Sequence, residues 1–187
     1  MYPFAVAQLN QPLSRARFRR MIRPVLGLWV SRPWLGYGHV LFLELGRLHL
    51  ETVEWSGAKP PRVKRGQATL LFHCDWKAES GSSPSFGIKS PVSVLRRGVA
   101  GLRDRRVSGL DVENRGCGLV LELSPHVRVR TEGAPDWDLF LLDERLFPRE
   151  SRWNGVDHTL GVGTSEEGEL QQFVCYAPRP QASAPGP

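Results

Sequence analysis

The stretch Val25-Leu26-Gly27-Leu28-Trp29-Val30 decides how this chain is interpreted, because its Val-x-Gly-Leu-x-Val frame returns at Val107–Val112. Four further matches follow in the same order along the chain: Gly36–Gly38 with Gly116–Gly118, Phe42–Leu45 with Val120–Leu123, Leu48–Thr52 with Val127–Thr131, and Leu71–Lys77 with Leu139–Arg145. Any two amphipathic strands resemble each other, so a single match carries little weight. Colinear matches, in contrast, predict one supersecondary unit that is used twice.

The residues around the first match have the periodicity of β-strands. Val25–Val30 and Val40–Leu45 are rich in β-forming residues, and Leu48–Thr52 alternates apolar and polar side chains. Gly46-Arg47 is a connection of suitable length for a tight hairpin between the last two segments. A further strand is predicted over Ala68–Cys74. Loops are predicted at Ser56–Gly66 and Ser80–Ser85, where Gly, Pro and Ser gather.

Two segments have the pattern of helices. Over Pro12–Arg23, four apolar residues partly mark one side and five arginines crowd the rest. The second helix begins at Ser90-Pro91, where Ser90 is expected to cap the free N–H groups and Pro91 to occupy the first helical position. Its apolar side is predicted from steps of three and four residues, at Val92, Leu95, Val99 and Leu102.

Together these patterns predict an α+β fold made mainly of antiparallel β meanders, in which two related helix-plus-meander halves form one compact domain. The predicted organisation is a basic N-terminal helix (1–24), a first β meander half (25–89), a connecting helix (90–104), a second β meander half (105–177) and a disordered tail (178–187). The tail is predicted from its Pro, Ala, Ser and Gly content.

The formal net charge of +6 hides two oppositely charged parts. Residues 1–106 hold 18 Lys and Arg against 6 Asp and Glu, whereas residues 107–187 hold 7 against 13. Clustered basic charge is typical of nucleic-acid binding. Mutual attraction between the two parts, together with ordinary solvated surface, explains the same segregation without any partner. We therefore keep both interpretations.

Several classes of protein find no support in the sequence. The apolar stretches are far shorter than the roughly 18 residues of a membrane span, and Met1–Ala7 lacks the pattern of a signal peptide. The three cysteines are widely spaced, which favours reduced thiols and a cytoplasmic location. No short-spaced pair of metal ligands and no phosphate-binding glycine loop occurs, so we expect no metal, no cofactor and no catalytic constellation.

The candidate binding residues are the most chemically varied stretch, His73-Cys74-Asp75-Trp76-Lys77, two tryptophans near other predicted strand ends, Trp55 and Trp137, and three residues of the basic loop, Arg62, Lys64 and Arg65. Trp and Arg are enriched at energetic anchors of protein interfaces, and aromatic rings beside basic residues also stack nucleic-acid bases. A third interpretation makes Cys74 a thiol nucleophile with a base among His39, His49, His126 and His158, since His73 is its strand neighbour and faces the other way.

These residues also carry a resemblance. Gly27, Phe42–Gly46, Leu71–Lys77, the second meander and the late Trp153 and His158 are similar to a family of uncharacterised bacterial proteins of about this length. In that family a strand ends in Cys-x-Trp-Arg, and here Lys77 stands in place of the arginine. The resemblance implies a bacterial cytoplasmic origin and transfers no activity and no functional residue.

The sequence therefore favours a non-enzymatic bacterial binding or interaction protein of the immunity or accessory type, with another protein as its partner. The first alternative is a nucleic-acid-binding protein that uses Arg15–Arg23, Lys59–Arg65 and Arg96–Arg106. The second alternative is a thiol enzyme that uses Cys74. The sequence does not indicate an oligomeric state.

Overall fold

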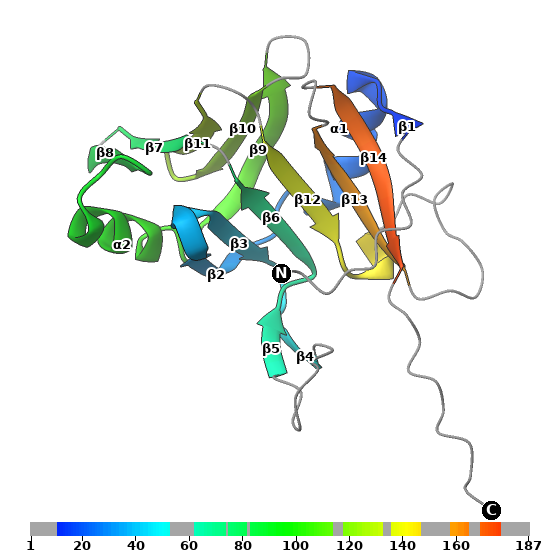
Figure 1. Cartoon of the computed structure of the whole chain (residues 1–187), viewed down its shortest axis with the longest axis horizontal. Helices are drawn as coiled ribbons and strands as arrows, with labels where there is room; N and C mark the ends of the chain where they lie inside the picture. The colour runs from blue at the N-terminus through cyan, green and yellow to red at the C-terminus, as the bar shows by residue number, and fades with distance from the viewer. Residues whose placement is uncertain are drawn as a thin grey trace, which may run out of the picture.

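Short antiparallel strands and two short helices make up the computed structural model, which describes residues 11–52, 62–73, 75–81, 83–113, 118–132, 136–146, 158–164 and 169–176 (Figure 1). In the first part of the chain lie β1 (Gln11–Pro12), α1 (Arg15–Ile22), the 3-10 helix η1 (Arg23–Val25), β2 (Val30–Leu35), the 3-10 helix η2 (Tyr37–His39), β3 (Leu41–Leu45), β4 (His49–Thr52), β5 (Arg62–Arg65), β6 (Ala68–Phe72), β7 (Trp76–Ser80) and β8 (Ser83–Gly87). The second part holds α2 (Val92–Ala100), β9 (Arg106–Glu113), β10 (Gly118–Ser124), β11 (Val127–Thr131), β12 (Trp137–Leu141), the 3-10 helix η4 (Glu144–Leu146), β13 (His158–Thr164) and β14 (Leu170–Tyr176).

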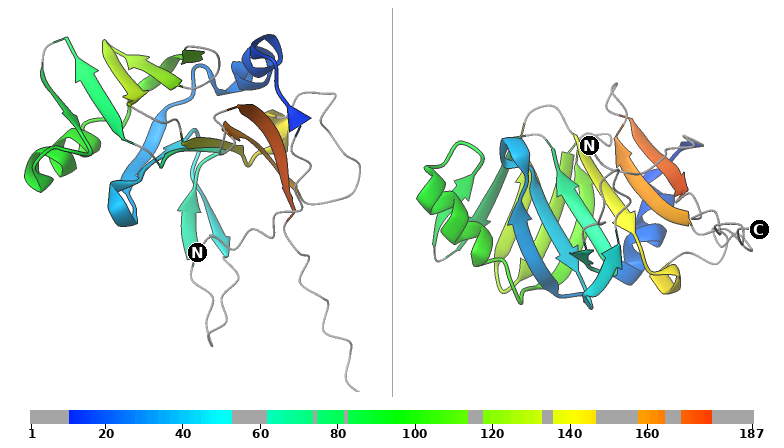
Figure 2. Two further views of the ribbon diagram at one scale, coloured as in Figure 1. Left: turned by 45° about the horizontal axis from the view of Figure 1, so that its top comes forward. Right: turned by 60° about the horizontal axis from the view of Figure 1, so that its bottom comes forward.

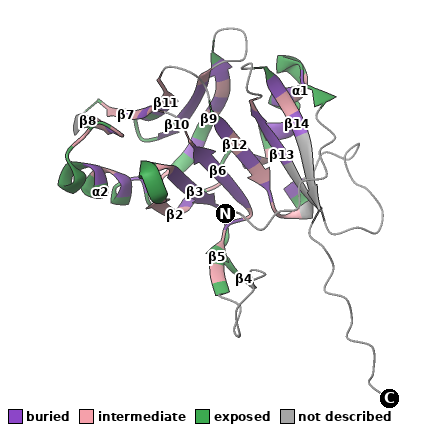
Figure 3. Cartoon of the chain, viewed as in Figure 1, coloured by how far each residue is buried: buried purple, intermediate pink, exposed green. Residues whose placement is uncertain are grey.

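The strands form two large sheets and one separate hairpin. The seven-stranded sheet has the order β1-β14-β13-β12-β6-β3-β2, and the five-stranded sheet has the order β8-β7-β11-β10-β9. Their inner faces pack on each other, with α1 and α2 at opposite sides of the molecule (Figure 2). One cluster of buried apolar side chains joins both sheets and both helices (Figure 3). The predicted class, α+β with mainly antiparallel strands, is confirmed.

The two meanders exchange strands. In the first, β2 pairs with β3 and β3 with β6; in the second, β9 pairs with β10 and β10 with β11. The next strand of each then crosses to the other sheet, so that β7 pairs with β11 and β12 pairs with β6. Each sheet therefore contains strands from both parts of the chain: β12, β13 and β14 join the sheet of the first meander, and β7 and β8 join the sheet of the second.

The helices follow the predicted apolar sides. In α1, Phe18, Met21 and Ile22 are buried, and the Ser14 hydroxyl caps the helix by accepting a hydrogen bond from the Arg17 N–H. In α2, Leu95 and Val99 are buried. Ser90 does not cap α2 as predicted, because its hydroxyl instead accepts a hydrogen bond from the Gly87 N–H at 3.0 Å.

Four local predictions are wrong, each because a turn or a strand pairing lies elsewhere. Over Val25–Val30 the strand begins only at Val30, since a 3-10 helix and Gly27, with φ of +88°, come first. Gly46-Arg47 makes no hairpin, because β3 pairs with β2 and β6 while β4 pairs with β5. The predicted loop Ser56–Gly66 contains β5, and Ser80–Ser85 contains the end of β7 and the start of β8.

Candidate functional site

The segment around Trp76 is a corner between β6 and β7, and most of its side chains already have partners. Trp76 is only 1% exposed, and its indole N–H donates to the carbonyl of His39 at 3.1 Å. Asp75 pairs with Lys89 at 2.8 Å, and Lys77 pairs with Glu79 at 2.9 Å. Cys74 lies outside the described residues. The side chain of Trp76 is therefore part of the core.

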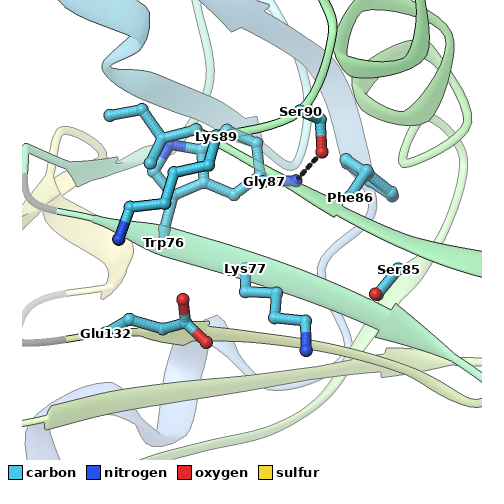
Figure 4. Close-up of a pocket in the computed structure, with 9 residues that line it drawn as sticks. Trp76, Lys77, Ser85, Phe86, Gly87, Lys89, Ser90 and Glu132 are labelled. Carbon is cyan, nitrogen blue, oxygen red and sulfur yellow. Dashed lines mark hydrogen bonds between the residues drawn. The ribbon is translucent and has the colours of Figure 1, made fainter.

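A pocket of about 240 Å³ opens beside this corner. Figure 4 shows the side chains of Lys77, Lys89 and Glu132 around it, with Phe86 and Ser85 contributed by β8. The hydrogen bond that the Lys89 ammonium donates to Asp75 raises the pKa of Lys89, which keeps that ammonium charged. Lys77 and Lys89 are both paired with carboxylates, so the charges around the pocket nearly balance. Among the residues that line the pocket, no hydrogen bond joins a nucleophilic side chain to a base.

His73 belongs to a separate polar pair on the outer face of the seven-stranded sheet. Its Nε2 lies 3.0 Å from Oδ2 of Asp138. The hydrogen bond with Asp138 raises the pKa of His73, although partial burial opposes this. The geometry orients an imidazole as in a base–carboxylate pair. The pair adds a side-chain contact between the end of β6 and its neighbour β12, which come from the two different parts of the chain.

Of the candidate tryptophans Trp55, Trp76 and Trp137, the two that the structure describes, Trp76 and Trp137, are buried and form no exposed surface. Trp137 is fully buried on β12 and packs edge-on against Phe18 of α1, with ring centroids 5.9 Å apart. Trp76 is buried as well, and Trp55 lies outside the described residues. The exposed tryptophan is Trp29, which is 49% exposed and lies under the guanidinium of Arg106 at 4.6 Å. Trp29 was not among the candidate binding residues. Its sequence context, an aromatic residue two positions after Gly27, was the only indication of this arrangement.

The remaining predicted residues lie on the hairpin of β4 and β5, which we call the hairpin arm. These two strands pair only with each other, and they project away from both large sheets (Figure 1). Directly opposite residues of an antiparallel pair share a face. Leu50 lies opposite Lys64, and Arg62 follows two positions away, so these three side chains share one face of the arm. Leu50 is 62% exposed, and Arg62 and Lys64 are exposed too.

Arg65 lies on the other face of the hairpin arm and anchors it. Its guanidinium reaches Glu44 of β3 at 3.3 Å and Glu51 of β4 at 3.4 Å, and its side chain is only 11% exposed. Glu44 is fully buried and also accepts hydrogen bonds from the Gly66 N–H at 3.0 Å and the Thr69 hydroxyl at 2.6 Å. A two-stranded hairpin alone is marginally stable. The buried ion pair therefore fixes the arm to the seven-stranded sheet.

Several basic residues elsewhere are paired with carboxylates, whereas others, such as Arg96 and Arg97 of α2, are exposed to solvent. On α1, Arg15 and Arg19 both bind Asp111, at 2.9 and 2.7 Å. Although burial opposes it, these hydrogen bonds hold the pKa of Asp111 well below its usual range. The outer face of the five-stranded sheet carries Arg128 paired with Glu122 and Arg130 paired with Glu79. The pairs of Arg15, Arg19 and Arg130 join the two oppositely charged parts of the chain. On the hairpin arm, the exposed face that carries Arg62 and Lys64 has no acidic residue among the residues described there.

Comparison with protein-family models found none that matches the chain, and comparisons with curated proteins and with solved structures found no match either. The resemblance drawn from the Cys-x-Trp-Lys stretch therefore remains a prediction. Within the described ranges, no helix is long and apolar enough to cross a membrane. The same part of the chain contains no group of three or more His, Cys, Asp or Glu side chains placed to hold a metal ion.

Proposed function

We propose that this chain is a non-enzymatic binding protein of the immunity or accessory type, and that it engages another protein through the hairpin arm. The observation that carries the proposal is an exposed apolar residue beside exposed basic residues, on an element that projects from both sheets and is anchored at its base. Leu50 is 62% exposed on a projecting hairpin that is held by a buried ion pair. A rigid arm with an exposed apolar residue and basic neighbours is suited to a protein interface, because ordering costs little when the arm is already fixed.

The test is recovery of a partner from the native cells. The tagged chain and a variant with Leu50→Asp and Lys64→Glu are purified in parallel, and co-purifying proteins are identified by mass spectrometry. We expect a partner that is retained by the native chain and lost by the variant. A control with Arg96→Glu and Arg97→Glu, on the exposed side of α2, should retain it. A strictly monomeric protein without a reproducible partner contradicts the proposal.

The second candidate function is nucleic-acid binding, and one specific observation favours it. Trp29 is half-exposed under Arg106, an arrangement that offers a base both a ring to stack on and a cation. This function predicts affinity that falls steeply with salt. Trp29→Ala should then weaken the binding of single-stranded DNA or RNA in mobility-shift assays at low salt. If the native chain binds neither at low salt, this candidate is eliminated.

The thiol-enzyme alternative depends on Cys74, which lies outside the described residues. It predicts that Cys74 reacts with iodoacetamide at neutral pH faster than a model thiol does. A rate equal to or below that of the model thiol removes its support. We also retain the cytoplasmic location as a proposal, since it rests on the cysteine content and on the resemblance.

We further propose that the two meanders arose by duplication of one unit. Support comes from their shared three-strand order and from the reciprocal exchange of β7 and β12. Of the matched frames, Phe42–Leu45 and Val120–Leu123 lie on equivalent strands, β3 and β10, whereas Leu48–Thr52 and Val127–Thr131 lie on β4 and β11, which hold different places in the two meanders. In this proposal the hairpin arm is an insertion between the second and third strands of the first unit.

A further inference from the structure

The hairpin arm has one open backbone edge. β4 pairs with β5 through the register His49 with Arg65 to Thr52 with Arg62, and with no other described strand. The Lys64 carbonyl of β5 accepts a hydrogen bond from the Arg32 guanidinium of β2 at 3.3 Å. The backbone of β5 therefore contacts the body of the protein, whereas no described residue outside the arm bonds to the backbone of β4, whose edge is left for an added strand.

The other sheet edges are less suited to an added strand. β2, at the edge of the seven-stranded sheet, contains Pro33, which cannot donate to a ladder. The Val107 N–H and C=O of β9 already bond to the turn at Gly27 and Leu28. An unpaired strand edge is a template for pairing with an extended segment, and β4 is the described strand that presents one on a projecting element.

The charge on the arm decides which segment fits. Arg62 and Lys64 lie on the same face as Leu50, and no acidic residue is described on that face. A second copy of the arm, paired edge to edge through β4, would place its own basic β5 on the outer side and bring no described acidic residue to that face. An extended segment with acidic side chains on that face would instead lie beside Leu50 and approach both cations.

We infer that the open edge of β4 binds an extended acidic segment of a partner protein as a third strand of the hairpin arm. The inference rests on the proposed function and names the kind of segment that the partner supplies. Main-chain hydrogen bonds to β4 give the affinity, as in other cases of strand addition. Contacts to Leu50, Lys64 and Arg62 give the preference for an acidic sequence. A third strand also makes the two-stranded arm more stable.

The test uses the full chain and defined peptide probes. An eight-residue peptide of alternating Glu and Val is titrated into the ¹⁵N-labelled protein, next to a Lys–Val peptide and a Glu–Val peptide that is N-methylated at alternate residues. We expect the acidic peptide to shift the amide signals of His49–Thr52. N-methylation should abolish binding on the methylated edge, and the Lys–Val peptide should bind at least ten-fold more weakly.

Variants separate the arm from the rest of the surface. Arg62→Glu with Lys64→Glu should raise the Kd of the acidic peptide at least ten-fold, because two exposed cations become anions, while Arg96→Glu with Arg97→Glu should leave it within two-fold. Circular dichroism checks that both variants are folded. Equal binding of the acidic and basic peptides, insensitivity to N-methylation, or the absence of binding overturns the inference.

A 12-base-pair DNA duplex is included as the competing polyanion. If the duplex binds and the arm variant loses this binding while the peptide does not bind, the arm is a nucleic-acid contact and the inference is wrong. If a native partner is recovered and lost by the Leu50 and Lys64 variant while the peptide does not bind, the proposed function stands and only the acidic strand is refuted. If no partner is recovered, the proposed function itself fails.

Discussion

Replacement of Glu44 by alanine is the perturbation that best tests how the hairpin arm is held. The Glu44 carboxylate is fully buried, and its removal leaves Arg65, only 11% exposed, without its buried partner. It also leaves the Gly66 N–H and the Thr69 hydroxyl, both buried, without their acceptor. Breaking a buried ion pair costs about 3–5 kcal/mol, and two buried donors left unsatisfied cost roughly 2–6 kcal/mol. The broken ion pair alone therefore predicts a loss of about 3–5 kcal/mol in the free energy of unfolding, and the unsatisfied donors add to this loss.

The assay is urea unfolding followed by tryptophan fluorescence, together with hydrogen exchange of the arm amides. The matched control is Glu122→Ala, since Glu122 pairs with Arg128 at 2.9 Å but both side chains are about half exposed; the expected loss is at most about 1 kcal/mol. The double variant Glu44→Leu with Arg65→Met should recover much of the loss, because neither charge then stays buried alone. If Glu44→Ala costs no more than Glu122→Ala, the arm is not anchored by this pair.

Three further changes test other parts of the fold. Asp138→Asn should lower the free energy of unfolding more at pH 5.5 than at pH 8.5. The raised pKa of His73 contributes stability that is present below its unfolded pKa of about 6.5 and is lost as the pH rises through the folded pKa. NMR titration of His73 and urea unfolding at both pH values check this, and an equal loss at both pH values contradicts it. Gly66→Ala should lower the melting temperature markedly, because its Cβ would meet the Leu45 carbonyl oxygen at 2.5 Å, whereas Gly81→Ala, with open space around it, should change it little. Phe18→Ala should cost about 3–5 kcal/mol in chemical unfolding, since Phe18 is fully buried against Trp137; a loss below about 1 kcal/mol would mean that α1 is not part of the common core.

The sequence predicted the features that depend on local periodicity. Both helices were found because apolar side chains recur at helical spacing, and Phe18, Met21, Leu95 and Val99 are buried as that spacing requires. Strands rich in β-forming residues, such as Leu41–Leu45 and Ala68–Phe72, were found from their composition. Composition and alternation also gave the antiparallel class of the sheets.

Strand pairing was not predictable, because no local signal states which strand a segment will meet. Leu48–Thr52 alternates as a strand should, and a glycine precedes it, so a hairpin with β3 was the natural expectation. The segment instead pairs with Arg62–Arg65, four residues whose basic, Pro-flanked context is typical of a loop. The exchange of β7 and β12 between the sheets also depends on long-range pairing. It follows from the positions of β6 and β11, each of which is the last strand of its own meander and pairs with the strand that crosses from the other one.

The candidate site shows the same division between residue type and placement. The sequence analysis chose Arg62, Lys64 and Arg65 for their charge, and the structure separates them: two lie on the exposed face of the hairpin arm, and the third lies against a buried glutamate. Their alternation follows from strand geometry, which sends successive side chains to opposite faces. Trp76 was also chosen for its residue type. It is the first residue of β7, and its side chain is buried in the core.

Burial of Glu44 connects the fold to the proposed function. A buried ion pair is weak evidence for stability, because an apolar pair of the same shape would often hold the fold as well. Such a pair is better explained here by geometry, since Glu44 binds Arg65 of β5, the Gly66 N–H after the arm and Thr69 of β6. These bonds set the angle at which the arm leaves the sheet, whereas an apolar contact would leave it free to turn. The arm therefore presents Leu50, Arg62 and Lys64 in one fixed orientation, which is what recognition by an added strand requires.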